Sequence, residues 1–383
     1  MSGRVFRNFV YCFSVLILSC IFSCGSLALK HRTISLIDRG ADEETKALYK
    51  NLLAISGKGI LFGQQDALYY GIGWQGEKDR SDVKSVTGSH PAVFGWDFQK
   101  IVIEMLEKPE AEWKETTALR HLIKEAYDKG GVNTLSWHMQ NFVTGESFYD
   151  TTRCVPSILP RGRKHEDYNK ALDQAAEFIR SLKGSDGAHI PIIFRPFHEH
   201  TGNWFWWGKP HCTVSEYKEL WRYTVHYLRD KKQLHNILYA YSPDRIGGKF
   251  EEYMERYPGD GYVDILGFDN YWEFKDRASF PLAVKSLALI CRYARSKNKP
   301  AALTETGLEK ITDKNWFTEV LNSIKADKDA RYISYMMVWR NAHTGHFYAP
   351  YPGHPSEADF IKFYNDAYTL FLTDISEFHK YKR

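Results

Sequence analysis

The chain has 383 residues, of which 43% are hydrophobic and 26% charged, as is typical of a globular protein with a sizeable core. Its 51 basic and 47 acidic residues nearly balance at a formal charge of +4, and no Lys/Arg block stands out, so composition argues against a nucleic-acid partner. Aromatic residues reach 15%, a share that suits either a core rich in rings or a sugar-binding cleft lined with them.

The N-terminal residues predict an export signal rather than part of the fold. Arg4 and Arg7 precede an apolar run over 9–22, which is shorter than a membrane-spanning helix requires. An aliphatic residue lies three positions before Cys24 and a small one just before it, which resembles the lipobox of a bacterial lipoprotein. Cys20 is an alternative acylation site, and an ordinary signal peptide that happens to contain cysteines is the other interpretation.

We therefore expect a signal peptide over residues 1–24, a short linker over 25–35 and one catalytic domain over 36–383. The expected location is outside the cytoplasm, on a membrane through a lipid anchor at the periplasmic or cell-surface side, or otherwise secreted. The mature chain keeps three cysteines with no metal-ligand spacing, so dense disulfide stapling is excluded and a single bridge stays open. They are Cys154, Cys212 and Cys291.

Short apolar runs of strand type recur along the chain, each followed by a segment with helical periodicity. Continuous apolar runs are typical of strands buried on both faces, as in parallel sheets. Helical stripes lie between them, for example at 167–182 and 215–229. Eight such units over about 300 residues predict a single-domain (β/α)₈ TIM barrel of the α/β class. The runs are 59–63, 92–96, 132–137, 192–195, 236–240, 263–268, 301–304 and 333–339.

An open doubly wound sheet is the rival arrangement, but no Gly-x-Gly-x-x-Gly follows an early strand. In a (β/α)₈ barrel the active site lies at the C-terminal ends of the strands. Polar and aromatic residues end five of the predicted strands. They are Trp137 and His138 after the third, Arg195 to Glu199 after the fourth, Asp269 to Trp272 after the sixth, Glu305 at the seventh, and Trp339 and Arg340 after the eighth.

Glu199 and Glu305 follow strands on opposite sides of the predicted barrel mouth. One carboxyl group could protonate a departing glycosidic oxygen while the other attacks the anomeric carbon. His198 and Arg195, next to Glu199 in sequence, could orient a carboxylate and hold its charge. Four consecutive aromatic residues, 204–207, then follow; because neighbouring rings in a regular element cannot all face the core, we predict that they line a cleft beside Glu199.

Other hydrolytic chemistries have less support. His198 and Glu199 begin like the zinc-protease pattern His-Glu-x-x-His, but Gly202 stands where the second ligand belongs. His198 and His200 could share a metal only if both faced the same side, and no third ligand is near in sequence. No Gly-x-Ser-x-Gly elbow follows a strand. We therefore expect neither a metal nor a cofactor.

The segment 194–208, Phe-Arg-Pro-Phe-His-Glu-His-Thr-Gly-Asn-Trp-Phe-Trp-Trp-Gly, resembles the acid/base signature of the family 26 glycoside hydrolases. These are mostly retaining endo-β-1,4-mannanases with a (β/α)₈ barrel. The resemblance implies that Glu199 is the acid/base, that His198 helps to hold the nucleophile and that Trp204 stacks on substrate. The similarity extends from about Leu36 to near Phe371.

Further segments resemble other positions of that family. Thr-Glu-Thr-Gly at 304–307 is similar to the nucleophile segment and implies that Glu305 is the nucleophile. Asp-Asn-Tyr at 269–271 implies that Tyr271 contacts nucleophile and substrate and that Asp269 shapes the cleft. The remaining implied substrate contacts are His138, with sugar hydroxyls, and the pair Trp339 and Arg340, of which the tryptophan floors the site of the attacked sugar.

The resemblance implies a monomeric enzyme that acts on β-mannan polysaccharide or oligosaccharide. The same family includes enzymes that cut mixed-linkage β-glucan or β-1,3-xylan, which is the alternative substrate class. A non-catalytic polysaccharide-binding lipoprotein is the alternative of another kind, against which the two intact glutamates argue. The insert at about 139–165 could block one end of the cleft, so the sequence leaves open whether the enzyme cuts mid-chain or from an end.

Overall fold

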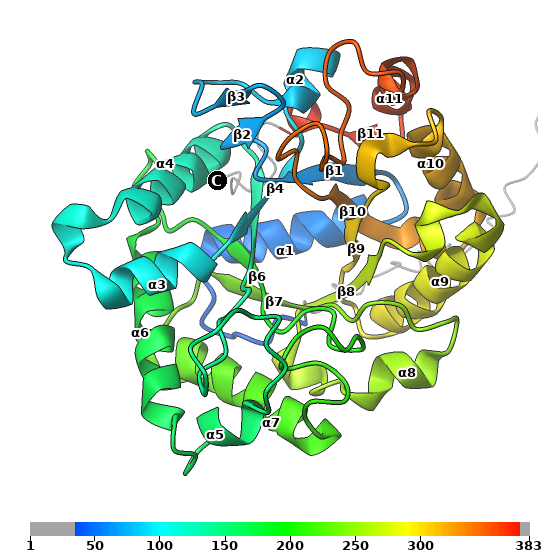
Figure 1. Cartoon of the computed structure of the whole chain (residues 1–383). Helices are drawn as coiled ribbons and strands as arrows, with labels where there is room; N and C mark the ends of the chain where they lie inside the picture. Colours follow the sequence, from blue (N-terminus) through cyan, green and yellow to red (C-terminus); the bar gives the residue numbers. More distant parts are fainter. Residues whose placement is uncertain (1–34, 376–383) are drawn as a thin grey trace, which may run out of the picture. The chain divides into compact units, whose positions relative to one another are not determined.

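A computed structural model describes residues 35–375 of the chain. Eight parallel strands close into a barrel, in which the last strand pairs with the first (Figure 1). The expected (β/α)₈ barrel is therefore confirmed. The strands are β1 (Ile60–Gln65), β4 (Val93–Asp97), β5 (Val132–Ser136), β6 (Ile192–Arg195), β7 (Ile237–Tyr241), β8 (Ile265–Asn270), β9 (Ala301–Thr306) and β10 (Ile333–Val338).

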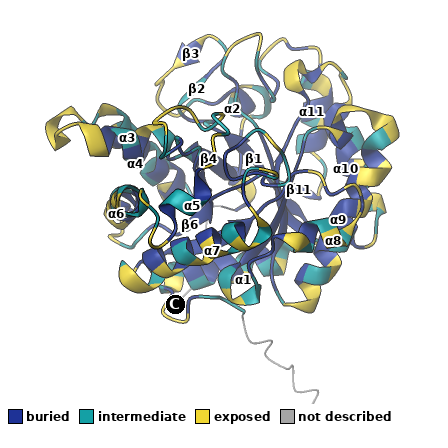
Figure 2. Cartoon of the chain, turned by 60° about the horizontal axis from the view of Figure 1, so that its bottom comes forward, coloured by how far each residue is buried: buried dark blue, intermediate teal, exposed yellow. Residues whose placement is uncertain are grey.

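Helices surround the barrel and present their outer faces to solvent, while the strands are buried (Figure 2). In order they are α2 (Asp82–Thr87), α3 (Gln99–Glu107), α4 (Lys114–Asp128), α5 (Val155–Ile158), α6 (His165–Ser181), α7 (Val214–Val225), α8 (Phe250–Glu255), α9 (Phe280–Ser296), α10 (Trp316–Ala326) and α11 (Glu357–Tyr364). The two predicted helical stripes correspond to α6 and α7. Helix α7 begins at a capping box in which Thr213 and Glu216 satisfy each other's backbone amides.

Three short strands are not part of the eight-stranded barrel. β2 (Tyr70–Gly71) and β3 (Trp74–Gln75) form an antiparallel hairpin in the segment after β1, and β11 (Thr369–Leu370) pairs with the outside of β1. Sequence periodicity missed all three because two residues are too few to show an alternation. Within residues 35–375, none of the helices is both long and apolar enough to cross a membrane.

Strand residues alternate between two hydrophobic cores. Ile192 and Phe194 of β6 face the layer between barrel and helices, whereas Ile193 between them faces the barrel interior. Helix α1 (Glu43–Ile55) adds Leu48 and Leu52 to the interior core, so it lies across one end of the barrel (Figure 1). The interior is thus filled with side chains, and the opposite end is left for the functional residues.

The described N-terminal segment is held at that same α1 end. The amide of Ile37 donates to Asp264 at 2.9 Å, and the ammonium of Lys299 donates to the carbonyl of Ser35 at 3.3 Å. Asp264 and Lys299 directly precede β8 and β9, so these contacts lie at the N-terminal ends of the strands. The domain therefore begins on the side opposite the barrel mouth. The predicted signal peptide and nearly all of the predicted linker fall outside the described residues.

Candidate active site

Glu199 lies in the turn that follows β6, in a backbone conformation that side-chain-bearing residues rarely adopt. Its φ is 52°, and that of Phe197 two residues earlier is 49°, both in the left-handed region. The amide of Glu199 donates to the carbonyl of Ser242, after β7, at 2.8 Å. Such strained residues concentrate where the surrounding structure must aim a functional side chain. Here the turn directs the carboxyl group of Glu199 toward the barrel mouth.

The surroundings of Glu199 favour its protonated form. Burial raises the pKa of its carboxyl group well above the usual range, and the charges of Glu305, Asp244 and Asp269 act in the same direction. The indole of Trp204 donates to Oε2 at 2.8 Å. A general acid requires a carboxyl group with a raised pKa and an oxygen left to carry the proton, which here is Oε1.

Glu305 is the fifth residue of β9 and is buried, with 4% of its surface exposed. The strand carries one extra residue here relative to both neighbours, since Leu303 and Glu305 pair with the consecutive residues Phe268 and Asp269 of β8. A β-bulge of this kind re-aims a side chain. The guanidinium of Arg195 donates to Oε1 of Glu305, and the hydroxyl of Tyr271 donates to Oε2 at 2.9 Å. These two donors hold the carboxyl group of Glu305 in one orientation.

Arg195 connects the carboxyl groups of Asp269 and Glu305 beneath the barrel mouth. Its guanidinium donates to Oδ2 of Asp269 at 2.8 Å as well as to Glu305. Ser242 and Thr304 donate their hydroxyls to the two oxygens of Asp269, at 3.1 and 2.6 Å. Burial raises the pKa of Asp269, and the guanidinium acts in the opposite direction. Asp269 therefore fixes Arg195, which in turn fixes Glu305.

Two histidines and an aspartate form a second chain of hydrogen bonds at the mouth. Nδ1 of His138 lies 2.6 Å from Oδ2 of Asp97, and its Nε2 lies 3.1 Å from Nε2 of His198. Burial, together with Arg195 and His138, holds the pKa of His198 well below its ordinary value, so this ring is neutral. The two rings therefore share one hydrogen bond between their Nε2 atoms, and Asp97 holds the ring of His138 from the other side.

A cavity of about 270 Å³ opens beside these groups, on the side of the mouth formed by β10, β1, β4 and β5. Trp339 and Arg340, directly after β10, and His138, after β5, line it as the sequence predicted. Arg340 donates to the hydroxyl of Tyr70 at 3.3 Å, and that hydroxyl donates to Asp66 at 2.5 Å. The cavity thus offers rings and hydrogen-bonding groups together, as a sugar site requires.

Comparison with known proteins decides the family. The model described as glycosyl hydrolase family 26 matches residues 37–370, nearly all of the described chain. The chain belongs to glycosyl hydrolase family 26. The expected family is therefore confirmed, and the match includes both glutamates and all of the predicted contact residues.

The family 26 relatives include proteins described as mannanases. A mannan endo-1,4-beta-mannosidase of Bifidobacterium adolescentis is 39% identical over 367 residues, which cover 88% of this chain but 36% of that relative, so the chain spans about a third of its length. The solved beta-mannanase of Bacteroides ovatus shares 42% identity at a TM-score of 0.81, covering 89% of this chain and 98% of that one. The catalytic domain of the Bacillus sp. JAMB-750 endo-beta-1,4-mannanase shares 38% at 0.84, covering 91% and 96%.

The aromatic run after Glu199 does not line the cleft as predicted. Trp204 is half-buried beside the acid, but Phe205, Trp206 and Trp207 are buried in the core with at most 3% of their surface exposed. The indoles of Trp206 and Trp207 donate to the backbone carbonyls of Met139 and His198, both at 2.9 Å or less. The run is an irregular turn, and in a turn consecutive side chains can face inward together.

His198 does not make the contact that the family resemblance implied. Its hydrogen bond goes to His138, whereas Arg195 and Tyr271 hold Glu305. The pair His198 and His200 is likewise separated, because His200 lies between the rings of Tyr217 and Tyr241, with centroids 4.4 and 4.8 Å away. Among residues 35–375, no group of three or more His, Cys, Asp or Glu side chains is placed to hold a metal.

Several polar residues of the mouth were missed by the sequence analysis. Asp97 is the last residue of β4, and Asp66, Ser242 and Asp244 follow barrel strands directly or within three residues. The signal that found the other positions was present for these as well, because each comes just after one of the predicted apolar runs. Phe148 and Tyr149, from the insert predicted to close one end of the cleft, also line the cavity.

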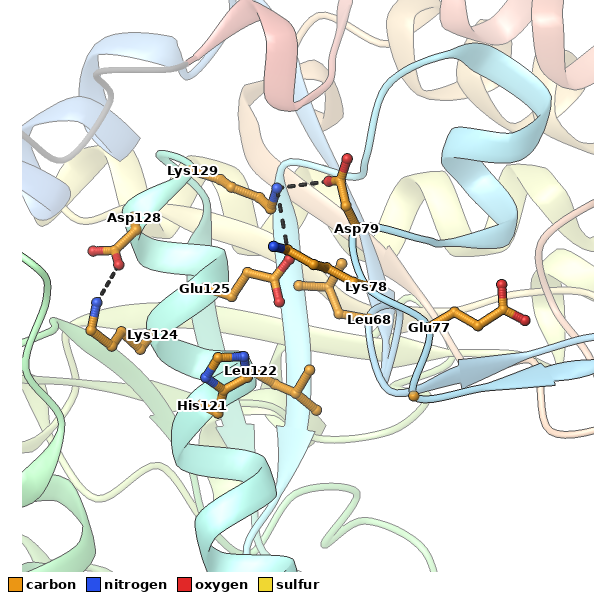
Figure 3. A pocket seen from close by; sticks show the side chains of 11 residues that line it. Leu68, Glu77, Lys78, Asp79, His121, Leu122, Lys124, Glu125, Asp128 and Lys129 are labelled. Atoms are coloured by element: carbon orange, nitrogen blue, oxygen red, sulfur yellow. Dashed lines mark hydrogen bonds and ion pairs between the residues drawn. The ribbon is translucent and has the colours of Figure 1, made fainter.

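A second depression, of about 570 Å³, lies away from the mouth between α4 and the segment around β3 (Figure 3). Its charged side chains pair with one another: Lys129 lies 2.7 Å from Asp79 and 3.7 Å from Glu125, and Lys124 lies beside Asp128 at 2.5 Å. Such partly exposed pairs are surface contacts of small energy. The buried thiols of Cys154, Cys212 and Cys291 are free, so no bridge forms among these three.

Proposed function

We propose that this chain hydrolyses β-1,4-mannosidic linkages of mannan, galactomannan or glucomannan with retention of configuration. The observation that carries the proposal is the pair of carboxyl groups at the mouth of a family 26 barrel: the pKa of Glu199 is held well above its usual range, and Glu305 is bonded to the guanidinium of Arg195. When the surroundings of two carboxyl groups differ in this way, one can act as the general acid and the other as the nucleophile. The descriptions of the similar proteins as mannanases support the substrate class.

In the first step the ionised Glu305 attacks the anomeric carbon while Glu199 gives its proton to the departing oxygen. This forms a glycosyl ester on Glu305 and releases the shortened sugar chain. In the second step Glu199, now ionised, takes a proton from water as that water attacks the same carbon, which frees Glu305. Arg195 and Tyr271 keep the Glu305 carboxylate oriented in both steps. Trp204 orients Glu199 through its Oε2.

The deciding experiment follows fresh products by proton NMR on mannan, galactomannan, glucomannan and lichenan in parallel. We expect hydrolysis of the three mannans and initial release of the β anomer, because retaining enzymes hold their carboxyl groups about 5–5.5 Å apart for direct attack. Initial release of the α anomer would remove Glu305 from the nucleophile role. Hydrolysis of lichenan alone would give the chain the mixed-linkage glucan activity instead, and binding without hydrolysis would make it a polysaccharide-binding protein.

We also propose that the enzyme is exported and anchored by lipid at Cys24. The described domain begins at the end of the barrel opposite the mouth, so an anchor attached before it would leave the cleft accessible to polymer. The full-length protein should partition into the detergent phase, and Cys24→Ala should move it to the aqueous phase. Cys20→Ala is the matched control and should behave like the parent. The reverse pattern would place the acylation at Cys20, and aqueous parent protein would contradict the anchor.

A further inference from the structure

Trp272 is unusual among the eleven tryptophans of the chain because its side chain is exposed to solvent. It has 55% of its surface exposed, whereas the other ten, all within the described residues, are buried or half-buried. A large apolar ring left in water forgoes the stabilisation that burial would bring. The fold holds this ring outward at the barrel mouth, directly after Tyr271, whose hydroxyl contacts Glu305.

The position of Trp272 is fixed by its neighbours. The side-chain amide of Asn270 donates to Oε2 of Glu273 at 2.7 Å, and the backbone amide of Glu273 donates to Oδ1 of Asn270 at 2.9 Å. These two bonds hold the turn that carries the ring. The guanidinium of Arg245 lies over the indole at 4.7 Å from its centroid and donates to Asp244 at 3.1 Å. One face of the ring is therefore covered by a tethered cation, and the exposed area belongs to the rest of the ring.

This ring lies in the half of the mouth that the cavity does not occupy. Glu199 follows β6 and Glu305 lies in β9, so the catalytic pair divides the mouth into two parts. The cavity with Trp339 belongs to β10, β1, β4 and β5, while Arg245 and Trp272 follow β7 and β8 between the two glutamates. A polysaccharide cleaved between the glutamates must extend into both halves.

The two halves suit different parts of the substrate. The sugar that stays on the enzyme as an ester benefits from an enclosed cavity, whereas the departing chain needs an open surface from which it can leave. A β-linked mannosyl unit carries axial C–H groups on one face, which pack against the face of an aromatic ring. We propose that Trp272, backed by Arg245, is the platform for a mannosyl unit on the leaving-group side of the scissile bond. This inference rests on the proposed mannanase function.

The test compares Trp272→Ala with the parent on linear mannan and on a dinitrophenyl β-mannobioside, which has no sugar on the leaving side. We expect kcat/KM on mannan to fall about tenfold, the size of one aromatic stacking contact, with the aryl substrate unaffected. Trp272→Tyr, which keeps a ring, should retain most activity. Leu106→Ala, in an exposed residue at the end of α3, is the matched surface control and should change neither value.

Arg245→Gln provides a second variant that leaves the indole in place. It should also lower kcat/KM on mannan, but by a smaller factor than Trp272→Ala. The indole then loses the guanidinium that packs on it, while the ring itself is still present to contact the sugar. Equal losses on both substrates for Trp272→Ala, or no loss on mannan, would overturn the platform. Parent enzyme that hydrolyses no mannan would instead overturn the proposed function, so the two failures are distinguishable.

Discussion

Replacing Glu199 by alanine should lower kcat/KM on polymeric mannan by about 10²–10⁴-fold, the usual contribution of a general acid. The loss should be far smaller on a dinitrophenyl β-mannobioside, because that leaving group departs without a proton. The reason is local: the pKa of the half-buried Glu199 is held well above its usual range, and the residue stands in a strained turn. Steady-state kinetics on the two substrates measures the difference, and equal losses on both would remove Glu199 from the acid role.

The pH profile gives an independent reading of the same group. Because burial and nearby carboxylates raise the pKa of Glu199, the acid form persists to higher pH than for an ordinary glutamate. The alkaline limb of the parent's activity on mannan, where Glu199 loses its proton, should therefore lie well above the pH at which an ordinary glutamate ionises. In Glu199→Ala that alkaline limb should disappear. Persistence of the same limb in the variant would assign it to another group.

The barrel could be predicted from the sequence because its strands are buried on both faces. Such strands appear as continuous apolar runs. The eight predicted runs coincide with the eight barrel strands, and each predicted end lies within two residues of the observed one. The two glutamates were then found by a geometric rule that needs no side-chain detail, since residues just after parallel strands meet at one rim. The strand positions and the placement of the two glutamates at one rim thus follow from local pattern alone.

The contacts within the site could not be predicted in the same way. Arg195 and His198 both precede Glu199, and sequence order does not say which of them reaches Glu305. The structure gives that contact to Arg195, because it is the last residue of β6 and its side chain joins Asp269 and Glu305 inside the barrel. His198 comes after the chain has turned, and it meets His138 instead. One bulge or turn changes the direction of a side chain, and neither leaves a periodic signal.

Replacing Arg195 by methionine should cost about 3–5 kcal/mol of unfolding free energy at pH 7.5, because it leaves buried carboxyl groups without their cation. Arg195 is 1% exposed and donates to both Glu305 and Asp269, which are also buried. Urea unfolding followed by fluorescence measures the loss. Arg256→Met is the matched control: Arg256 is equally buried, at 3%, but its guanidinium donates to the carbonyl and thiol of Cys212.

The sign of the pH dependence separates this electrostatic loss from a packing defect. Burial already raises the pKa of Asp269 to about 8 against the guanidinium of Arg195, so removing that guanidinium should raise it further. A raised carboxyl pKa favours the folded state at low pH and costs stability as pH rises through it. The deficit of Arg195→Met relative to the parent should therefore grow as pH rises through about 8, the pKa of Asp269 in the parent, while that of Arg256→Met stays constant. A deficit independent of pH would show that Arg195 acts by filling space, and not by compensating the charge of the buried carboxyl groups it contacts.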